Sequence, residues 1–134
     1  MEDDRISLAH GNGGRFMREL IEEVFAEQLS ASELDVQADA VAIDLEGGEA
    51  MITTDGFTVQ PLEFPGGNIG SLAVHGTVND LAVAGARPMY LTLNAFIEEG
   101  FEMERLERIV GSLAAAAQAA GVRVSAGDTK VPVT

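Results

Sequence analysis

Two short segments combine an aspartate with glycine or lysine in a way that suits phosphate chemistry. Asp128 and the chain's single lysine, Lys130, follow Gly127 where a strand is expected to end, and Asp55 precedes Gly56 in a similar setting. A carboxylate can hold a divalent cation while an ammonium group binds phosphate oxygens. Taken alone, GDTK is better explained as a surface turn, and an ordinary turn is also the alternative for TTDG.

A glycine-rich stretch at residues 11–14 is the second candidate, because it leads directly into a helical pattern. Glycine costs chain entropy on folding, so three glycines in four positions need a reason. The amides at the start of a helix could face an anion, with Arg15 or Arg18 adding charge. The alternative is a plain turn with Asn12 in a left-handed conformation. The stretch matches neither a Walker A loop nor the dinucleotide-binding fingerprint.

The third candidate, Asp80, lies in an expected helix at residues 68–86 that is apolar almost all round and is therefore predicted to be buried. Asp80 is the only formally charged residue between Phe64 and Arg87. A buried carboxylate has to be paired or bound to metal. A metal ligand and a carboxylate satisfied by a cap or by Arg87 remain equal alternatives. The polar residues of this helix fall on one stripe, namely Asn68, Ser71, His75 and Asn79.

Hydrophobic periodicity predicts the elements that must position these residues. The pattern predicts mixed α and β structure, with a sheet packed against helices on one side. The last expected helix has a buried stripe and ends at Gly121, which is expected to cap it. That stripe consists of Leu106, Ile109, Val110, Leu113 and Ala117. Helices are expected at residues 14–29, 68–86 and 101–121, and strands at 6–10, 39–45, 49–57, 89–99 and 122–130, with a hairpin turn at 46–48 and the last strand breaking into a turn at GDTK.

Composition excludes several classes of function. Eight basic residues against 22 acidic ones give a net charge of −14, which repels nucleic acid. A polyanion such as ATP would then need a divalent cation to neutralise it. The chain has no membrane-spanning apolar run and no signal-peptide pattern, so we expect a cytoplasmic protein. The absence of cysteine excludes disulfides and thiol nucleophiles. At 134 residues the chain is expected to form one domain, and its ending at VPVT suggests part of a longer protein.

Three segments together resemble the family of the hydrogenase maturation protein HypE, in the PurM-like (aminoimidazole ribonucleotide synthetase-like) ATP-binding superfamily. They are HGNGGRFMREL, TTDGFTVQPLEFPGGNIGSLAVHGTVNDLAVAGARPMYL and AGVRVSAGDTK, and the resemblance covers residues 6–131 in order. It implies an α+β fold in which residues 1–134 form a single ATP-binding N-terminal domain. A mixed, mostly antiparallel sheet packs on helices and forms a β-barrel across a homodimer.

The resemblance also implies an activity and its cofactors, ATP and Mg²⁺. Full-length members use ATP to dehydrate a thiocarboxamide on their own C-terminal cysteine to a thiocyanate, the source of the cyanide ligands of nickel–iron hydrogenases. The implied partners are a second copy of the chain, a carbamoyltransferase and a metal-centre scaffold complex. The implied metal ligands are Asp55, Asp80, Asp128 and then Asp39. The implied nucleotide-binding residues are Gly11, Asn12, Gly13 and Gly14 over the phosphates, with Asn79 and Lys130 on phosphate or metal-bound water.

Two positions depart from the family pattern, since His75 stands where cysteine is expected and Asn68 where aspartate is expected. The family's second domain and cysteine tail are absent from this sequence, so the chain alone is expected to be inactive. One alternative is a related enzyme of the thiamine-monophosphate kinase or selenophosphate synthetase type, although PLEFPGG and GDTK favour the maturation family. The other is a non-catalytic dimerisation module that binds no nucleotide.

Overall fold

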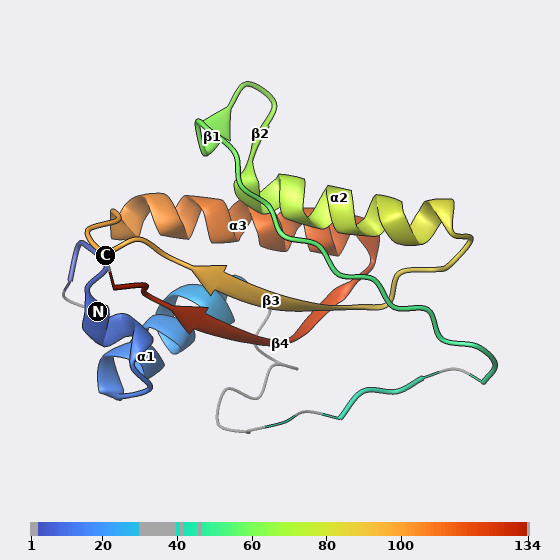
Figure 1. Ribbon diagram of the computed structural model, residues 1–134, viewed down its shortest axis with the longest axis horizontal. Coiled ribbons are helices and arrows are strands. Elements are labelled where there is room, and N and C mark those ends of the chain that lie inside the picture. Colours follow the sequence, from blue (N-terminus) through green and yellow to red (C-terminus); the bar gives the residue numbers. More distant parts are fainter. Residues whose placement is uncertain (1–2, 30–39, 41, 46, 134) are drawn as a thin grey trace.

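The computed structural model describes residues 3–29, 40, 42–45 and 47–133. Helices and strands are concentrated after residue 62, while a helical segment stands near the N-terminus (Figure 1). None of the described helices is both long and apolar enough to cross a membrane. The helical elements are the 3₁₀ helix η1 (Leu8–Gly11), α1 (Arg15–Leu20), the π-helical η2 (Ile21–Ala26), α2 (Ile69–Val83) and α3 (Met103–Ala120). The strands are β1 (Glu63–Phe64), β2 (Gly67–Asn68), β3 (Tyr90–Phe96) and β4 (Arg123–Lys130).

The strands β3 and β4 form the longer sheet, and they run parallel. Tyr90 lies opposite Arg123 and Phe96 opposite Lys130, with α3 as the crossover between the two strands. The expectation of a mostly antiparallel sheet is wrong for the described residues, where antiparallel pairing is limited to the two-residue strands β1 and β2 and an isolated bridge between Arg5 and Glu102. A parallel pair needs a crossover of a dozen or more residues, and the 18-residue α3 provides one.

The core lies between α3, the sheet and the N-terminal helical segment. All five residues of the expected stripe on α3 are buried, and Gly121 ends the helix in a left-handed conformation with φ of 72°, as predicted. One core cluster joins η2 and the first half of α3 to the ends of β3 and β4, and a second joins α2 to the second half of α3. The sheet and α3 thereby fix the N-terminal helical segment at one end of the molecule (Figure 1).

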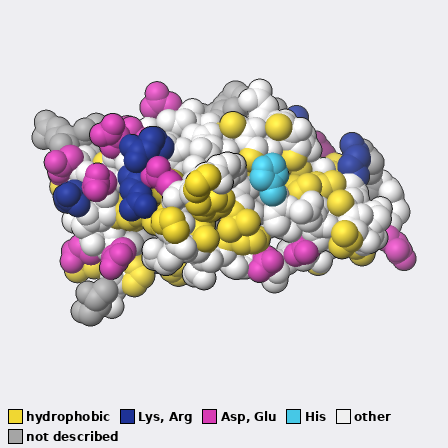
Figure 2. Space-filling view, turned by 90° about the horizontal axis from the view of Figure 1, so that it is seen from above, with side chains coloured by type: hydrophobic (Ala, Val, Ile, Leu, Met, Phe, Trp, Pro, Cys, Tyr) yellow, Lys and Arg dark blue, Asp and Glu magenta, His cyan; other side chains and the backbone are white. Residues whose placement is uncertain are grey.

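Helix α2 begins where expected, but it is not buried all round. Among its residues only Gly70 and Val74 are buried, and Val83 is 86% exposed. The buried side packs against α3 so closely that a Cβ atom at Gly70 would overlap the carbonyl oxygen of Ile109. One face of α2 packs against α3 and the Phe57 ring lies against Gly76, while other apolar side chains of α2 stay at the surface. Figure 2 views the molecule from above and shows apolar side chains gathered over the middle of this face.

Two expectations for the first half of the chain are wrong. Residues 6–10 form no strand, because the Ser7 amide donates to the ring of His10 and closes the turn that becomes η1. The described parts of the expected strands at 39–45 and 49–57 are assigned to no strand. They run as an extended chain beside the sheet (Figure 1). The Tyr90 hydroxyl on β3 donates to the Asp44 carbonyl oxygen at 2.7 Å and so connects this chain to the sheet. Glu46 of the expected hairpin turn lies outside the described residues.

Candidate functional site

The GDTK segment continues strand β4, so the expectation of a turn there is wrong. Asp128 and Lys130 are two residues apart on the strand and therefore point to the same face. Both are exposed, with 3.3 Å between the Lys130 Nζ and an Asp128 carboxylate oxygen, while Thr129 between them is buried. A Cβ atom at Gly127 would overlap the Leu93 carbonyl oxygen, which explains glycine at that position. The end of β4 thus presents a carboxylate and an ammonium group side by side.

The glycine-rich stretch lies against this end of β4. A Cβ atom at Gly11 would overlap the backbone nitrogen of Val131, the residue directly after Lys130. The left-handed residue is Gly13, with φ of 84°, and not Asn12, whose φ is −105°. Glycine takes this conformation at lower cost because it has no Cβ. Two expected site features, the glycine loop and GDTK, are therefore neighbours in space.

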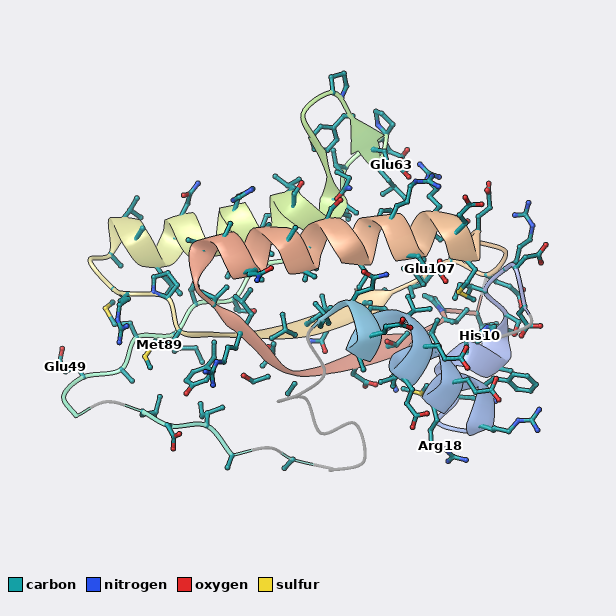
Figure 3. All side chains as sticks on the ribbon, turned by 180° about the vertical axis from the view of Figure 1, so that it is seen from behind. His10, Arg18, Glu49, Glu63, Met89 and Glu107 are labelled. Atoms are coloured by element: carbon teal, nitrogen blue, oxygen red, sulfur yellow. The ribbon has the colours of Figure 1, made fainter. Side chains whose placement is uncertain are left out.

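The amides of this glycine loop have only local partners. The Gly13 amide donates to the Met17 Sδ at 3.1 Å, and thioether sulfur is a weak acceptor. The Gly14 amide donates to the Asn12 side-chain oxygen at 3.1 Å. Arg18 lies one turn into α1, which begins at Arg15 (Figure 3). The loop can therefore turn these donors to an anion without breaking the main-chain ladder of a helix or a sheet.

The other expected metal ligands are not part of this group. Asp80 and Asn79 are exposed on α2, so the argument that a buried Asp80 must bind metal does not hold. Asp55 is exposed on the extended segment, where its carboxylate accepts the Gly56 amide at 2.8 Å. Asp39 lies outside the described residues.

The described chain does not assemble a metal centre by itself. No group of three or more His, Asp or Glu side chains is placed to hold a metal ion among the residues that the structure describes. Asp80 lies near the end of α2, which leads into the start of β3, whereas Asp128 lies opposite Asn94 toward the other end of that strand. The parallel register therefore separates the two carboxylates along the sheet.

Comparison with known proteins identifies the family. The model of the AIR synthase related protein family, N-terminal domain, matches residues 37–134. The chain belongs to this family. Over 131 residues it is 51% identical to the carbamoyl dehydratase HypE of Azotobacter vinelandii, a match that covers 98% of the chain and 38% of the relative. The chain thus spans well under half the length of such relatives.

Solved structures agree with this AIR synthase related assignment. A crystal structure of the hydrogenase maturation protein HypE in complex with ATP matches with a TM-score of 0.86 and 48% identity, covering 93% of this chain and 37% of that one. A HypE–HypF complex matches with a TM-score of 0.59 and 49% identity, covering 84% and 36%. The resemblance to HypE noted in the sequence is confirmed, and the PurM-like α+β fold with it. The thiamine-monophosphate kinase and selenophosphate synthetase alternative is not favoured.

The PLEFPGG segment of this AIR synthase related domain makes structural contacts in the described residues. Glu63 projects from β1 toward α3 (Figure 3), where one carboxylate oxygen accepts from Arg105 Nε and Arg108 Nη2, each at 3.1 Å. The hydrogen bond from Arg108 is the largest cause that holds the pKa of Glu63 below its ordinary value, followed by an opposing effect of desolvation and the bond from Arg105. The segment fastens the β1–β2 hairpin to α3.

Proposed function

We propose that this chain is the N-terminal, ATP-binding domain of a hydrogenase maturation protein. The observation that carries the proposal is the contact between the glycine loop and the end of β4, with Gly11 against Val131 beside Lys130 and Asp128. This arrangement occurs in a chain that is 48% identical to a HypE crystallised with ATP. The non-catalytic dimerisation module keeps the fold but offers no reason for these groups to be neighbours.

The chemistry of the group suits the phosphates of a nucleotide. The amides of Gly13 and Gly14 have local partners that an anion can replace, and the ammonium group of Lys130 is a point charge for a phosphate oxygen. Asn12 and Gly11 complete the loop over the phosphates. Asn79 is exposed and is proposed to contact phosphate or metal-bound water. In this proposal the phosphate competes with Asp128 for Lys130.

Mg²⁺ is proposed to arrive with the nucleotide. Magnesium is commonly held by one or two carboxylates together with substrate phosphates, and it needs no dedicated protein cage. This mode agrees with described carboxylates that stand apart from one another. The net charge of −14 makes a free ATP anion a poor ligand, so neutralisation by Mg²⁺ favours binding. The candidates for these one or two ligands are Asp55, Asp80 and Asp128, with Asp39 as the fourth.

The activity of the whole protein is proposed to be the ATP-dependent dehydration of a C-terminal cysteine thiocarboxamide to a thiocyanate. The 134 residues contain no cysteine, so this chain alone is expected to catalyse no such reaction. A carbamoyltransferase and a metal-centre scaffold are the proposed partners in the cytoplasm. A HypE–HypF complex among the matching structures supports a protein partner in hydrogenase maturation.

A homodimer is the proposed assembly, with a β-barrel across the interface. The support is the extended segment at residues 42–45 and 47–57, which pairs with no strand in the described part of the chain. Four large apolar side chains on it are exposed, and an unpaired extended segment of this kind is a template for another strand. They are Ile43, Leu45, Met51 and Ile52.

Calorimetric titration of Mg-ATP into the purified chain tests the nucleotide site. We expect saturable binding that EDTA abolishes and that Lys130→Ala and Asp128→Asn weaken by about tenfold, the loss of one charged contact. Glu104→Gln changes the same unit of charge on the exposed face of α3 and is expected to bind like wild type. Wild-type chain that takes up no Mg-ATP at any concentration would contradict the proposal for this domain.

Asp80→Asn separates a metal role from a structural one. A metal ligand predicts lower Mg-ATP affinity with an unchanged melting temperature in the absence of nucleotide. A structural role predicts a lower melting temperature and an unchanged affinity. Because Asp80 is exposed and the substitution keeps its size, we expect the first result.

A further inference from the structure

His10 is the one fully enclosed imidazole among the described residues, and it directly precedes the glycine loop. Its side chain is 0% exposed, and its Nδ1 accepts a hydrogen bond from the Ser7 amide at 2.8 Å. The Nε2 lies 3.4 Å from an Asp3 carboxylate oxygen but in no hydrogen-bond geometry with any described residue. The Phe16 ring stands edge-on to the imidazole at 6.1 Å. Figure 3 shows His10 at the end of the molecule where α1 lies.

The hydrogen bond from the Ser7 amide determines which ring nitrogen of His10 carries the hydrogen. A backbone amide only donates, so Nδ1 must carry a free lone pair and the neutral ring holds its hydrogen on Nε2. Burying such a polar ring is unfavourable unless its hydrogen bonds are made. Leucine would fill the same space without that penalty. The imidazole is therefore better explained by the turn that it closes than by its packing.

Main-chain hydrogen bonds hold the chain before His10, whereas the amides of Gly13 and Gly14 donate to side-chain atoms. The Ile6 amide donates to the Phe101 carbonyl at 2.8 Å, and the Gly100 amide donates to the Ile6 carbonyl at 2.7 Å. These bonds attach the N-terminal segment to the loop between β3 and α3. Beyond Gly11, the loop amides have only the local partners described above. His10 is thus the last anchored side chain before the proposed phosphate-binding amides.

We propose that His10 is a positioning residue for the nucleotide. Its Nδ1 holds the Ser7–Gly11 turn in the shape that sets Gly11 against Val131, so that the loop with the amides of Gly13 and Gly14 begins beside the end of β4. The inference rests on the proposed function, because it assigns a role within the same nucleotide site. It predicts that Mg-ATP affinity requires a hydrogen-bond acceptor at the position of Nδ1, whereas it does not require a polar atom at the position of Nε2.

Two amide substitutions separate the two ring nitrogens. In His10→Asn the side-chain oxygen replaces Nδ1, whereas in His10→Gln the amide reaches the position of Nε2 and leaves the Ser7 amide without its acceptor. We expect His10→Asn to bind Mg-ATP within about threefold of wild type and His10→Gln to lose about tenfold or more. Equal affinities for the two variants, or a larger loss for His10→Asn, would overturn the inference. If His10→Gln does not fold, His10→Leu takes its place in the comparison.

A measurement without nucleotide distinguishes failure of this inference from failure of the proposed function. The amide resonances of Gly13 and Gly14 report the shape of the loop in the free chain, whereas the Gly11 resonance shifts in any variant because it follows the substituted ring. We expect His10→Asn to leave the Gly13 and Gly14 resonances close to wild type and His10→Gln to shift both. If wild-type chain binds no Mg-ATP, the proposed function fails, and with it the role of His10 in binding nucleotide. Unchanged Gly13 and Gly14 resonances in His10→Gln overturn the positioning of the loop whether or not the wild-type chain binds nucleotide.

Discussion

Gly11 and Gly13 are both required as glycine, but for different reasons: one lacks space for a side chain, and the other has a left-handed backbone. Gly11 has an ordinary φ but no room for a Cβ, since the backbone of Val131 occupies that space. Gly13 has open space around it but a φ of 84°, which side chains rarely adopt. Only the first constraint ties the glycine loop to the end of β4. The two substitutions to alanine should therefore affect nucleotide binding differently.

Gly11→Ala should lower both stability and Mg-ATP affinity. Overlap with a backbone atom has no flexible side chain to absorb it, so we expect a loss of about 1–3 kcal/mol in the free energy of unfolding. Gly13→Ala should cost about 1–2 kcal/mol through backbone strain. Gly47, with open space around it, is the control and should change by less than about 0.5 kcal/mol. Urea denaturation and titration with Mg-ATP measure both effects; a neutral Gly11→Ala would contradict the close contact.

Residue types predict candidates well but predict burial poorly. The glycine loop and GDTK were both identified from sequence, and the structure makes them neighbours. Asp80 was identified from the apolar composition of its helix, but it is exposed. Composition cannot predict which faces of a helix are covered, because that depends on the elements, or the chains, that pack on it. His10 gave only a weak signal, since a single histidine beside a turn has no spacing partner.

At the scale of elements, the β1–β2 hairpin depends on one carboxylate. Both arginine contacts of Glu63 come from α3, so Glu63→Gln should weaken the attachment of the hairpin and lower the melting temperature slightly at neutral pH. The pKa of Glu63 is lowered from 4.5, so the folded protein holds fewer protons on this group than the unfolded chain. The stabilisation is therefore complete above pH 4.5 and is lost as the pH falls through the lowered pKa.

Melting temperatures of wild type and Glu63→Gln, followed from about pH 7 to about pH 3, check this dependence. The gap between the two should close at the acidic end, and added salt should reduce it because the pair is partly exposed. Glu104→Gln should follow the wild-type curve. A gap that stays constant across the pH range would mean that the charge of Glu63 has no part in the stability.

The start of α2 depends on Asn68 in a similar way. Its side-chain oxygen accepts from the amides of Gly70 and Ser71, and its amide donates to the Ser112 hydroxyl at 2.8 Å. Asn68→Ala should cost about 1–2 kcal/mol of stability. Asn68→Asp, the residue expected from the family pattern, keeps the cap and suits the helix N-terminus, so it should change stability by less than about 0.5 kcal/mol. Urea denaturation distinguishes the two; equal losses would show that the amide donor matters more than the cap.

The sequence predicted elements where one physical signal dominates. Helix α3 was predicted together with its buried stripe and its glycine cap, because an apolar period near 3.6 that continues over 18 residues is typical of an amphipathic helix. The parallel orientation of β3 and β4 was not predicted, since alternation along a strand is the same in parallel and antiparallel pairs. The strand expected at residues 6–10 failed because the side-chain bond of His10 to the Ser7 amide outweighs a five-residue alternation.

At the scale of the whole molecule, the extended segment that contains Ile52 exposes apolar surface that a second copy of the chain could cover. Ile52 is 95% exposed, and Ile43, Leu45 and Met51 leave further apolar surface uncovered. If a second copy covers it, Ile52→Glu should weaken the dimer by about a hundredfold or more, because each interface loses two apolar side chains worth about 1.5–3 kcal/mol each. Val83→Glu, a similarly exposed apolar site at the end of α2, is the control. Sedimentation equilibrium over a range of concentrations measures both; wild-type chain that stays monomeric throughout would contradict the proposed homodimer.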